Sequence, residues 1–195
     1  MRRAVLANMK VALSAVLLVP LAACGSGSEE TATATAAKTS DGTLAAAVSG
    51  APGLTTVATA LKATGLANVF DGTAPYTLLA PDDDAFGALG EAGKTLQAPE
   101  NGAAMAAILR DHILPGYLTV ADIEAALKAS GSDPVTMKTM GGKVLSFTRE
   151  GEALVVSTPD GARAKVDGAA LRASNGVVIP LDAVLRKLPT GASAG

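Results

Sequence analysis

The sequence predicts an α+β domain, because helical and strand patterns occupy different halves of the chain. Up to Ser130, apolar residues recur mainly at the i, i+3, i+4 spacing of helices. Beyond Gly131, short runs rich in β-branched residues alternate with turn signals. Three residue pairs at these breaks are typical of hairpin turns: Gly141-Gly142, Glu150-Gly151 and Asp160-Gly161. We therefore expect helices packed on a curled or sandwiched antiparallel sheet.

Helices dominate the first part of the domain. Helical or turn-like apolar patterns cover residues 43–49, 54–64 and 66–70. Gly65 ends the second of these segments, as glycine often does at a helix terminus. Residues 91–100 are mostly polar, which predicts a surface connection rather than a packed element. Asn101 is then expected to cap a helix that runs to Arg110.

A strand that turns directly into a helix is predicted between these helices. The apolar run Tyr76–Ala80 lies between two prolines and indicates a short buried strand. After Pro81, Asp82 occupies the expected N-cap position of a helix. Asp83 and Asp84 follow in the first turn, where the helix dipole favours negative charge. This corner should be rigid, and other elements can pack on it.

The second half begins with a short strand at His112–Leu114, which the turn Pro115-Gly116 ends. Thr119 is expected to open a helix over residues 120–129. The strands that follow are predicted at residues 135–139, 143–148, 153–157, 162–166 and 177–179. Pro180 cannot donate a ladder hydrogen bond, so we expect the end of the last strand to be an edge or a bulge.

The first residues have the features of a secretory signal peptide over 1–23. Arg2, Arg3 and Lys10 precede an apolar run at 11–19, which is shorter than the roughly 20 residues of a membrane span. Leu21-Ala-Ala-Cys24 resembles a bacterial lipobox, which implies cleavage before Cys24 and diacylglycerol on its sulfur. The alternative is an ordinary signal peptide that contains a cysteine. Lipidation would make the membrane one partner of this chain and place it in the cell envelope, on the periplasmic face of the outer membrane or at the cell surface.

Composition narrows the remaining possibilities. Cys24 is the single cysteine, so its acylation leaves no thiol for a disulfide, a thiolate metal site or a nucleophile. Residues 24–40 are rich in Gly, Ser, Thr and Ala and predict a flexible tether, followed by a domain over 41–189 and a disordered tail at 190–195. The chain has 16 basic and 18 acidic residues, and loss of the three basic residues of the signal peptide leaves a net charge of −5. Nucleic acid is therefore an unsuitable partner.

Three segments together resemble the fasciclin (FAS1) domain family. Leu79-Ala-Pro-Asp-Asp-Asp-Ala-Phe86 is similar to the first family box, which typically has the form Ala-Pro-Thr-Asp-Glu-Ala-Phe. Asp111-His-Ile-Leu-Pro-Gly116 is similar to the Tyr-His-Val-Val-Pro-Gly segment, and Asn175–Leu185 is similar to the second box. The resemblance implies a wedge-shaped β-sandwich with helices packed around it, and a non-enzymatic role in adhesion or in protein or matrix contacts. Asp111 and Ile179 replace the Tyr and the His of the family pattern.

The resemblance makes the 111–119 segment the predicted contact surface, together with the corner at 81–84. The candidate residues are Asp111, His112, Pro115, Gly116 and Tyr117. Tyr117 is either an exposed contact residue or part of the core. The three aspartates Asp82, Asp83 and Asp84 are interpreted as helix caps rather than as a cation site, because consecutive residues at a helix start diverge by about 100° each.

We expect a binding or adhesion module with an unknown protein or matrix partner, no cofactor and no metal. Two other hypotheses remain. The first is a carrier of a small apolar ligand, such as a pigment or a lipid. The second is an envelope hydrolase that depends on His112, the only histidine. A buried structural role is the simpler interpretation of His112, since no G-x-S-x-G motif is present.

Overall fold

The computed structural model describes residues 38–131 and 133–187. The predicted signal peptide (1–23), the lipidation site Cys24, the tether up to residue 37 and the tail at 190–195 lie outside the described residues. Among the residues that are described, no helix is long and apolar enough to cross a membrane.

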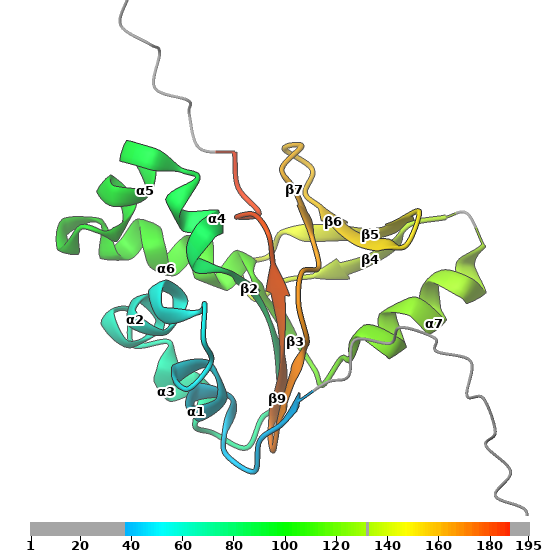
Figure 1. Ribbon diagram of the computed structural model, residues 1–195, viewed down its shortest axis with the longest axis horizontal. Helices are drawn as coiled ribbons and strands as arrows, with labels where there is room; N and C mark the ends of the chain where they lie inside the picture. Colours follow the sequence, from blue (N-terminus) through cyan, green and yellow to red (C-terminus); the bar gives the residue numbers. More distant parts are fainter. Residues whose placement is uncertain (1–37, 132, 188–195) are drawn as a thin grey trace, which may run out of the picture. The chain divides into compact units, whose positions relative to one another are not determined.

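The described chain has most of its helices first and most of its strands later (Figure 1). The helices are α1 (Leu44–Ser49), α2 (Thr55–Ala63), α3 (Ala67–Phe70), α4 (Asp83–Gly87), α5 (Gly90–Gln97), the 3₁₀ turn η1 (Pro99–Asn101), α6 (Gly102–Asp111) and α7 (Val120–Ser130). The strands are β1 (Lys38–Thr39), β2 (Tyr76–Pro81), β3 (Ile113–Pro115), β4 (Val135–Lys138), β5 (Val144–Glu150), β6 (Ala153–Ser157), β7 (Arg163–Lys165), β8 (Leu171–Ala173) and β9 (Gly176–Leu181). The α+β prediction is confirmed.

Two sheets form the framework. The first has the order β1-β8-β9-β2-β3, and its central pair, β2 and β9, is parallel with Tyr76 opposite Gly176 and Leu78 opposite Val178. The second has the order β4-β5-β6-β7 and is entirely antiparallel. Its hairpins fall at the predicted glycine pairs, and Gly142, Gly151 and Gly161 all have positive φ.

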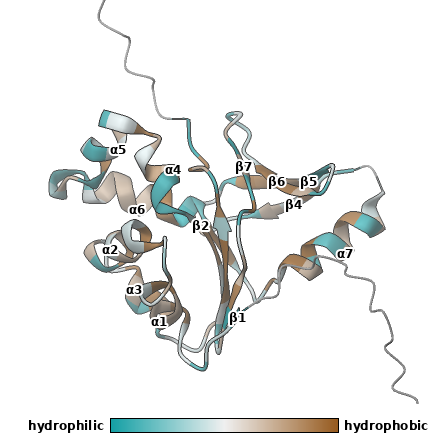
Figure 2. Cartoon of the chain, in the orientation of Figure 1, coloured by the Kyte–Doolittle hydropathy of each residue, from teal (hydrophilic) through white to brown (hydrophobic). Residues whose placement is uncertain are grey.

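The first sheet is buried on both faces. Successive side chains of β2 and β9 point to opposite faces, and each face packs against a different core. Leu78, Ala80 and Val178 belong to a core shared with the helices α1, α2 and α6. Leu79 and Ile179 belong to a second core, shared with strands β5 and β6 of the other sheet and with α7. In Figure 2, α7 carries hydrophobic and hydrophilic bands, as expected for a helix that covers the edge of this second core.

Backbone hydrogen bonds between the end of β9 and the residues at the end of β7 connect the two sheets next to Pro180. The Asp167 N–H donates to the Pro180 carbonyl at 3.0 Å, and the Asp182 N–H donates to Lys165 at 3.1 Å. The body of β9 lies between β8 and β2, but its end at Pro180 is an edge on the β8 side, as the sequence predicts. Proline is tolerated there because β8 begins at Leu171, opposite Val178, and so does not extend alongside Pro180.

Other sequence predictions require correction. Residues 90–97 form α5 rather than a surface connection, and only Gly93 and Leu96 of this helix are buried, which left almost no apolar signal. The predicted tether ends earlier than expected, since Lys38–Thr39 pairs with β8 in parallel. Asn101 does not cap α6 with its side chain, but donates from Nδ2 to the Thr95 carbonyl at 2.7 Å.

Candidate functional site

The corner after β2 caps two helices at once. Asp82 is the N-cap of α4, and its Oδ1 accepts a hydrogen bond from the Ala85 N–H at 2.6 Å, as predicted. Asp83 points instead to α2, where its carboxylate accepts from the N–H of Thr56 at 2.7 Å and of Thr55 at 3.2 Å. The N-cap residue of α2, Leu54, has no polar side chain to serve these donors. Asp83 therefore supplies the cap that α2 lacks.

The capping role of Asp83 affects its acidity. Burial raises the pKa of its carboxyl group, but the hydrogen bonds from Thr56 and Thr55 outweigh this effect, so the pKa lies below its ordinary value. Asp84 is exposed in the first turn of α4. Asp82 thus caps α4, Asp83 caps α2, and Asp84 faces solvent. Within 38–131 and 133–187, no group of three or more acidic, His or Cys side chains is arranged to hold a metal ion.

His112 is fully buried and follows α6 as its C-terminal cap residue. Its Nδ1 lies 2.8 Å from the Ile108 carbonyl, and its Nε2 accepts from the Leu185 N–H at 2.9 Å. These partners require the neutral tautomer with the proton on Nδ1. Burial lowers the pKa of His112 to about 4, against the opposing effects of the Ile108 carbonyl and Asp111. His112 is consequently not part of an exposed contact surface, since it connects α6 to the segment that follows β9.

Asp111, the residue before His112, forms an ion pair. Its carboxylate lies 3.2 Å from Lys143 Nζ, which is also 3.7 Å from Asp160, and the Asp111 and Lys143 side chains are both mostly buried. Gly141 packs directly against Asp111, where a Cβ would collide with the carboxylate. The Gly141 N–H donates to the Arg110 carbonyl at 2.9 Å. Asp111 therefore fastens the end of α6 to the β4–β5 hairpin, and Lys143 in turn connects that hairpin to Asp160 between β6 and β7.

Residues 115–117 form a turn at the end of the edge strand β3. Pro115 is exposed, Gly116 has a φ of 105°, and Tyr117 is 41% exposed. Thr77, a buried residue of β2, holds this turn: its hydroxyl donates to the Gly116 carbonyl and accepts from the Leu118 N–H, both at 2.9 Å. Thr77 was not among the predicted site residues, although a polar residue inside a buried apolar run often marks a structural hydrogen bond.

The candidate site thus resolves into a surface turn and interior residues. Pro115, Gly116 and Tyr117 form one turn, which we call the β3 turn, with Pro115 and Tyr117 exposed and Gly116 half-buried. Asp111 and His112 belong to the interior instead, because Asp111 pairs with Lys143 and His112 accepts from the Leu185 N–H. The 82–84 corner holds α2 and α4 rather than joining this surface.

A family model described as the Fasciclin domain matches residues 52–187, which is more than half of the chain. The chain belongs to the fasciclin domain family. Fasciclin domains are modules commonly involved in adhesion or binding and are generally non-enzymatic. The predicted resemblance is therefore confirmed.

Two known proteins extend this comparison. Protein sll1483 of Synechocystis sp. is 35% identical to this fasciclin domain protein over 133 residues, 67% of this chain and 65% of the relative. The chain thus spans about 65% of the length of that curated relative. The solved structure of a FAS1 domain pair from the insect cell adhesion molecule fasciclin I has a TM-score of 0.65, with 19% identity over 75% of this chain and 51% of that one. This likeness shows that the fold is shared.

Proposed function

We propose that this fasciclin domain is a non-enzymatic binding module of the cell envelope, tethered to a membrane by lipid on Cys24. It makes protein or matrix contacts through the β3 turn, with Tyr117 as the central residue. The observation that supports this surface is the pairing of an exposed aromatic side chain with a turn fixed by the buried hydroxyl of Thr77.

A tyrosine in this setting suits a contact residue. Its ring offers a large apolar area and its hydroxyl offers a hydrogen bond, and tyrosine is enriched at binding hot spots. A turn that is already ordered loses little conformational entropy on binding. Two acyl chains or more on Cys24 would hold the domain firmly at a bilayer, because each buried CH₂ contributes about 0.8 kcal/mol.

The hydrolase hypothesis receives no support from His112. Both ring nitrogens already have backbone partners, so neither is available to a substrate, and the ring is fully buried. The carrier hypothesis requires a pocket, which lies in another part of the helical layer.

Site-specific cross-linking on intact cells tests the proposed surface. The photoreactive residue p-benzoylphenylalanine is introduced in place of Tyr117 or, as a control, in place of Val144, the other exposed large apolar residue of the described chain, at 44% exposure. We expect a discrete adduct from position 117 and none from position 144. The captured partner is then purified and titrated with the full chain. Tyr117→Ala should weaken its binding at least about tenfold, whereas Val144→Ala should leave it unchanged. Equal adducts at both positions, or equal affinities of both variants, would overturn the proposal.

A further inference from the structure

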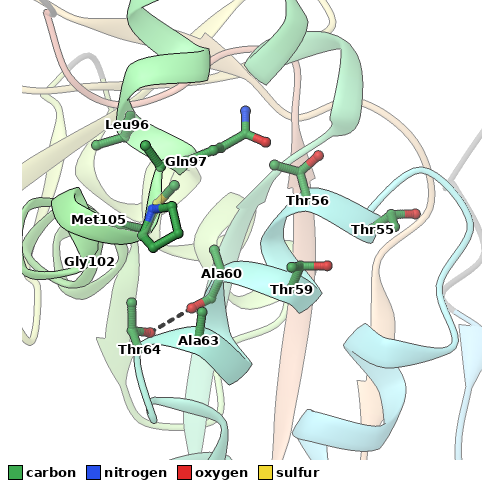
Figure 3. A pocket seen from close by; sticks show the side chains of 12 residues that line it. Thr55, Thr56, Thr59, Ala60, Ala63, Thr64, Leu96, Gln97, Gly102 and Met105 are labelled. Atoms are coloured by element: carbon green, nitrogen blue, oxygen red, sulfur yellow. Dashed lines mark hydrogen bonds between the residues drawn. The ribbon is translucent and has the colours of Figure 1, made fainter.

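A pocket of about 330 Å³ lies between α2 and the segment that contains α5, η1 and the start of α6 (Figure 3). It shares no lining residue with the β3 turn. In Figure 3, the labelled side chains of α2 lie across the pocket from Leu96, Gln97 and Met105. The volume is at the lower end of the range of about 300–1,000 Å³ that ligand pockets occupy, which suits a small ring system or the end of a longer molecule.

One part of the pocket is apolar and buried. Ala60, Leu96 and Met105 are each no more than 7% exposed and form its floor. Ala63 and Pro99 extend the apolar surface toward the opening. Methionine adapts its side chain to irregular shapes, so Met105 can adjust to ring systems of different outline.

The rim is polar but neutral. Thr55, Thr56 and Thr59 lie on the α2 side, and Gln97 lies on the α5 side. Within residues 38–131 and 133–187, the Thr59 hydroxyl and the Gln97 side-chain amide make no hydrogen bond to protein, so both are available to a ligand. These groups donate and accept, and therefore suit a hydroxyl or carbonyl group on the ligand.

The neutral lining of the pocket disfavours charged ligands. None of the described residues that line the pocket is charged. The first N–H groups of α2, which would otherwise attract an anion, are already bonded to the Asp83 carboxylate. A charged ligand would lose hydration here without gaining an ion pair.

We propose that this pocket binds a small neutral molecule with an apolar body and at least one hydroxyl or carbonyl group. The apolar body lies on Leu96 and Met105, and the polar group bonds to Thr59 or Gln97. This gives the carrier hypothesis a specific location and a ligand class, and it is independent of contacts at the β3 turn.

Three matched probes distinguish the ligand classes. The full chain carrying Cys24→Ser, which removes the lipidation site, is labelled with carbon-13 in its methionine methyl groups. It is titrated at pH 7 with 2-naphthol, naphthalene or 2-naphthoate. We expect 2-naphthol to shift the Met105 methyl signal in a saturable way. Naphthalene should also shift this signal, with an affinity between about two- and tenfold weaker, and 2-naphthoate should leave it unchanged. Met137 packs in the other core and should not shift with any probe.

Three variants localise the effect. Ala63→Leu fills the pocket and should abolish the Met105 shift, whereas Ala107→Leu, at an exposed position of α6 outside the pocket, should not. Thr59→Val combined with Gln97→Leu should lower the affinity for 2-naphthol to that for naphthalene and leave the affinity for naphthalene within about twofold of its original value. The proposal is overturned if Met105 does not respond to 2-naphthol, if 2-naphthoate binds equally well, or if Ala63→Leu has no effect. None of these results bears on the β3 turn, since the Tyr117 experiment has a separate readout.

Discussion

Nε2 of His112 accepts a 2.9 Å hydrogen bond from the backbone N–H of Leu185, 73 residues further along the chain. The other ring nitrogen is bonded to the Ile108 carbonyl. One buried imidazole therefore joins the end of α6 to the segment after β9, and it can do so only in its neutral form.

The stability of the fold should consequently fall in mild acid. The pKa of His112 is about 4 in the folded protein and near 6.5 in the unfolded chain, so the unfolded chain binds the extra proton first as pH falls. The stabilisation is complete above pH 6.5 and is lost progressively between 6.5 and about 4, by roughly 1.4 kcal/mol per pH unit and roughly 3 kcal/mol in total. Urea unfolding between pH 7.5 and 5 measures this slope. His112→Gln should be less stable at pH 7.5 and should lack the slope, and an identical slope in that variant would assign it to other groups.

Asp83→Ala should destabilise the fold by about 1 kcal/mol, because it removes the cap of α2. Asp83→Asn should lose less, since asparagine is also a good capping residue. The matched control is Asp84→Ala at an exposed position, which should change stability by less than about 0.5 kcal/mol. Urea midpoints of the three variants decide the matter, and equal losses at both positions would contradict the assignment.

Asn175→Ala should be among the more damaging polar substitutions, at about 3 kcal/mol. Its Oδ1 accepts from the Leu44 N–H at 2.7 Å, and its Nδ2 donates to the carbonyls of Phe70 at 2.7 Å and Gly72 at 2.5 Å. Each backbone group left without its partner costs about 1–3 kcal/mol where water cannot replace it. Thermal unfolding compares this variant with Asn68→Ala, an exposed position on α3. A loss below 1 kcal/mol would show that water serves these backbone groups.

Thr77→Val should both destabilise the protein and weaken partner binding, although Thr77 is buried. The change leaves the Leu118 N–H and the Gly116 carbonyl without the hydroxyl, which costs about 1–3 kcal/mol and loosens the turn that presents Tyr117. Calorimetric titration of the captured partner provides the measurement, and Thr136→Val on β4 is the control. If Thr77→Val lowers the stability but leaves the affinity for the partner unchanged, the order of this turn does not contribute to partner binding.

Cys24→Ser should move the protein from the membrane fraction to the soluble fraction, because the acyl chains are lost. Fractionation of cells that express each form, followed by immunoblotting, measures this change. Ser26→Ala, two residues away, should remain with the membrane. If Cys24→Ser stays with the membrane to the same extent, lipidation at this residue is not the anchor.

Local sequence signals predicted much of the fold. The Asp82 cap, the Thr119 capping box and the hairpins of the second sheet each depend on residues a few positions apart, so short patterns were sufficient. The partner of Asp83 was not predictable in this way, because Thr56 lies 27 residues away and the contact exists only after packing. The same reason applies to Asn175 and His112. Helix α5 was missed since its stability comes from packing at Gly93 and Leu96 rather than from an apolar stripe.

The sequence predicted which segment contains the candidate site, but not which of its residues are buried and which are exposed. The 111–117 segment was found by resemblance, but it has two parts: residues 112–114 are buried, whereas Pro115 and Tyr117 are exposed. Asp111 and His112 face inward, whereas Pro115 and Tyr117 are accessible to a partner. The pocket beside α2 left no signal, because its lining comes from four separate elements.

The parallel pairing of β2 with β9 also determines when the first sheet can form during translation. Tyr76 and Gly176 are neighbours in the sheet but 100 positions apart along the chain, so the central ladder cannot close until β9 has been translated. Closing a loop of this length costs entropy before any ladder contact forms, and such topologies fold slowly. The first sheet of an emerging chain therefore stays incomplete until nearly the whole domain has been translated. The predicted signal peptide at residues 1–23 is translated long before this pairing can form.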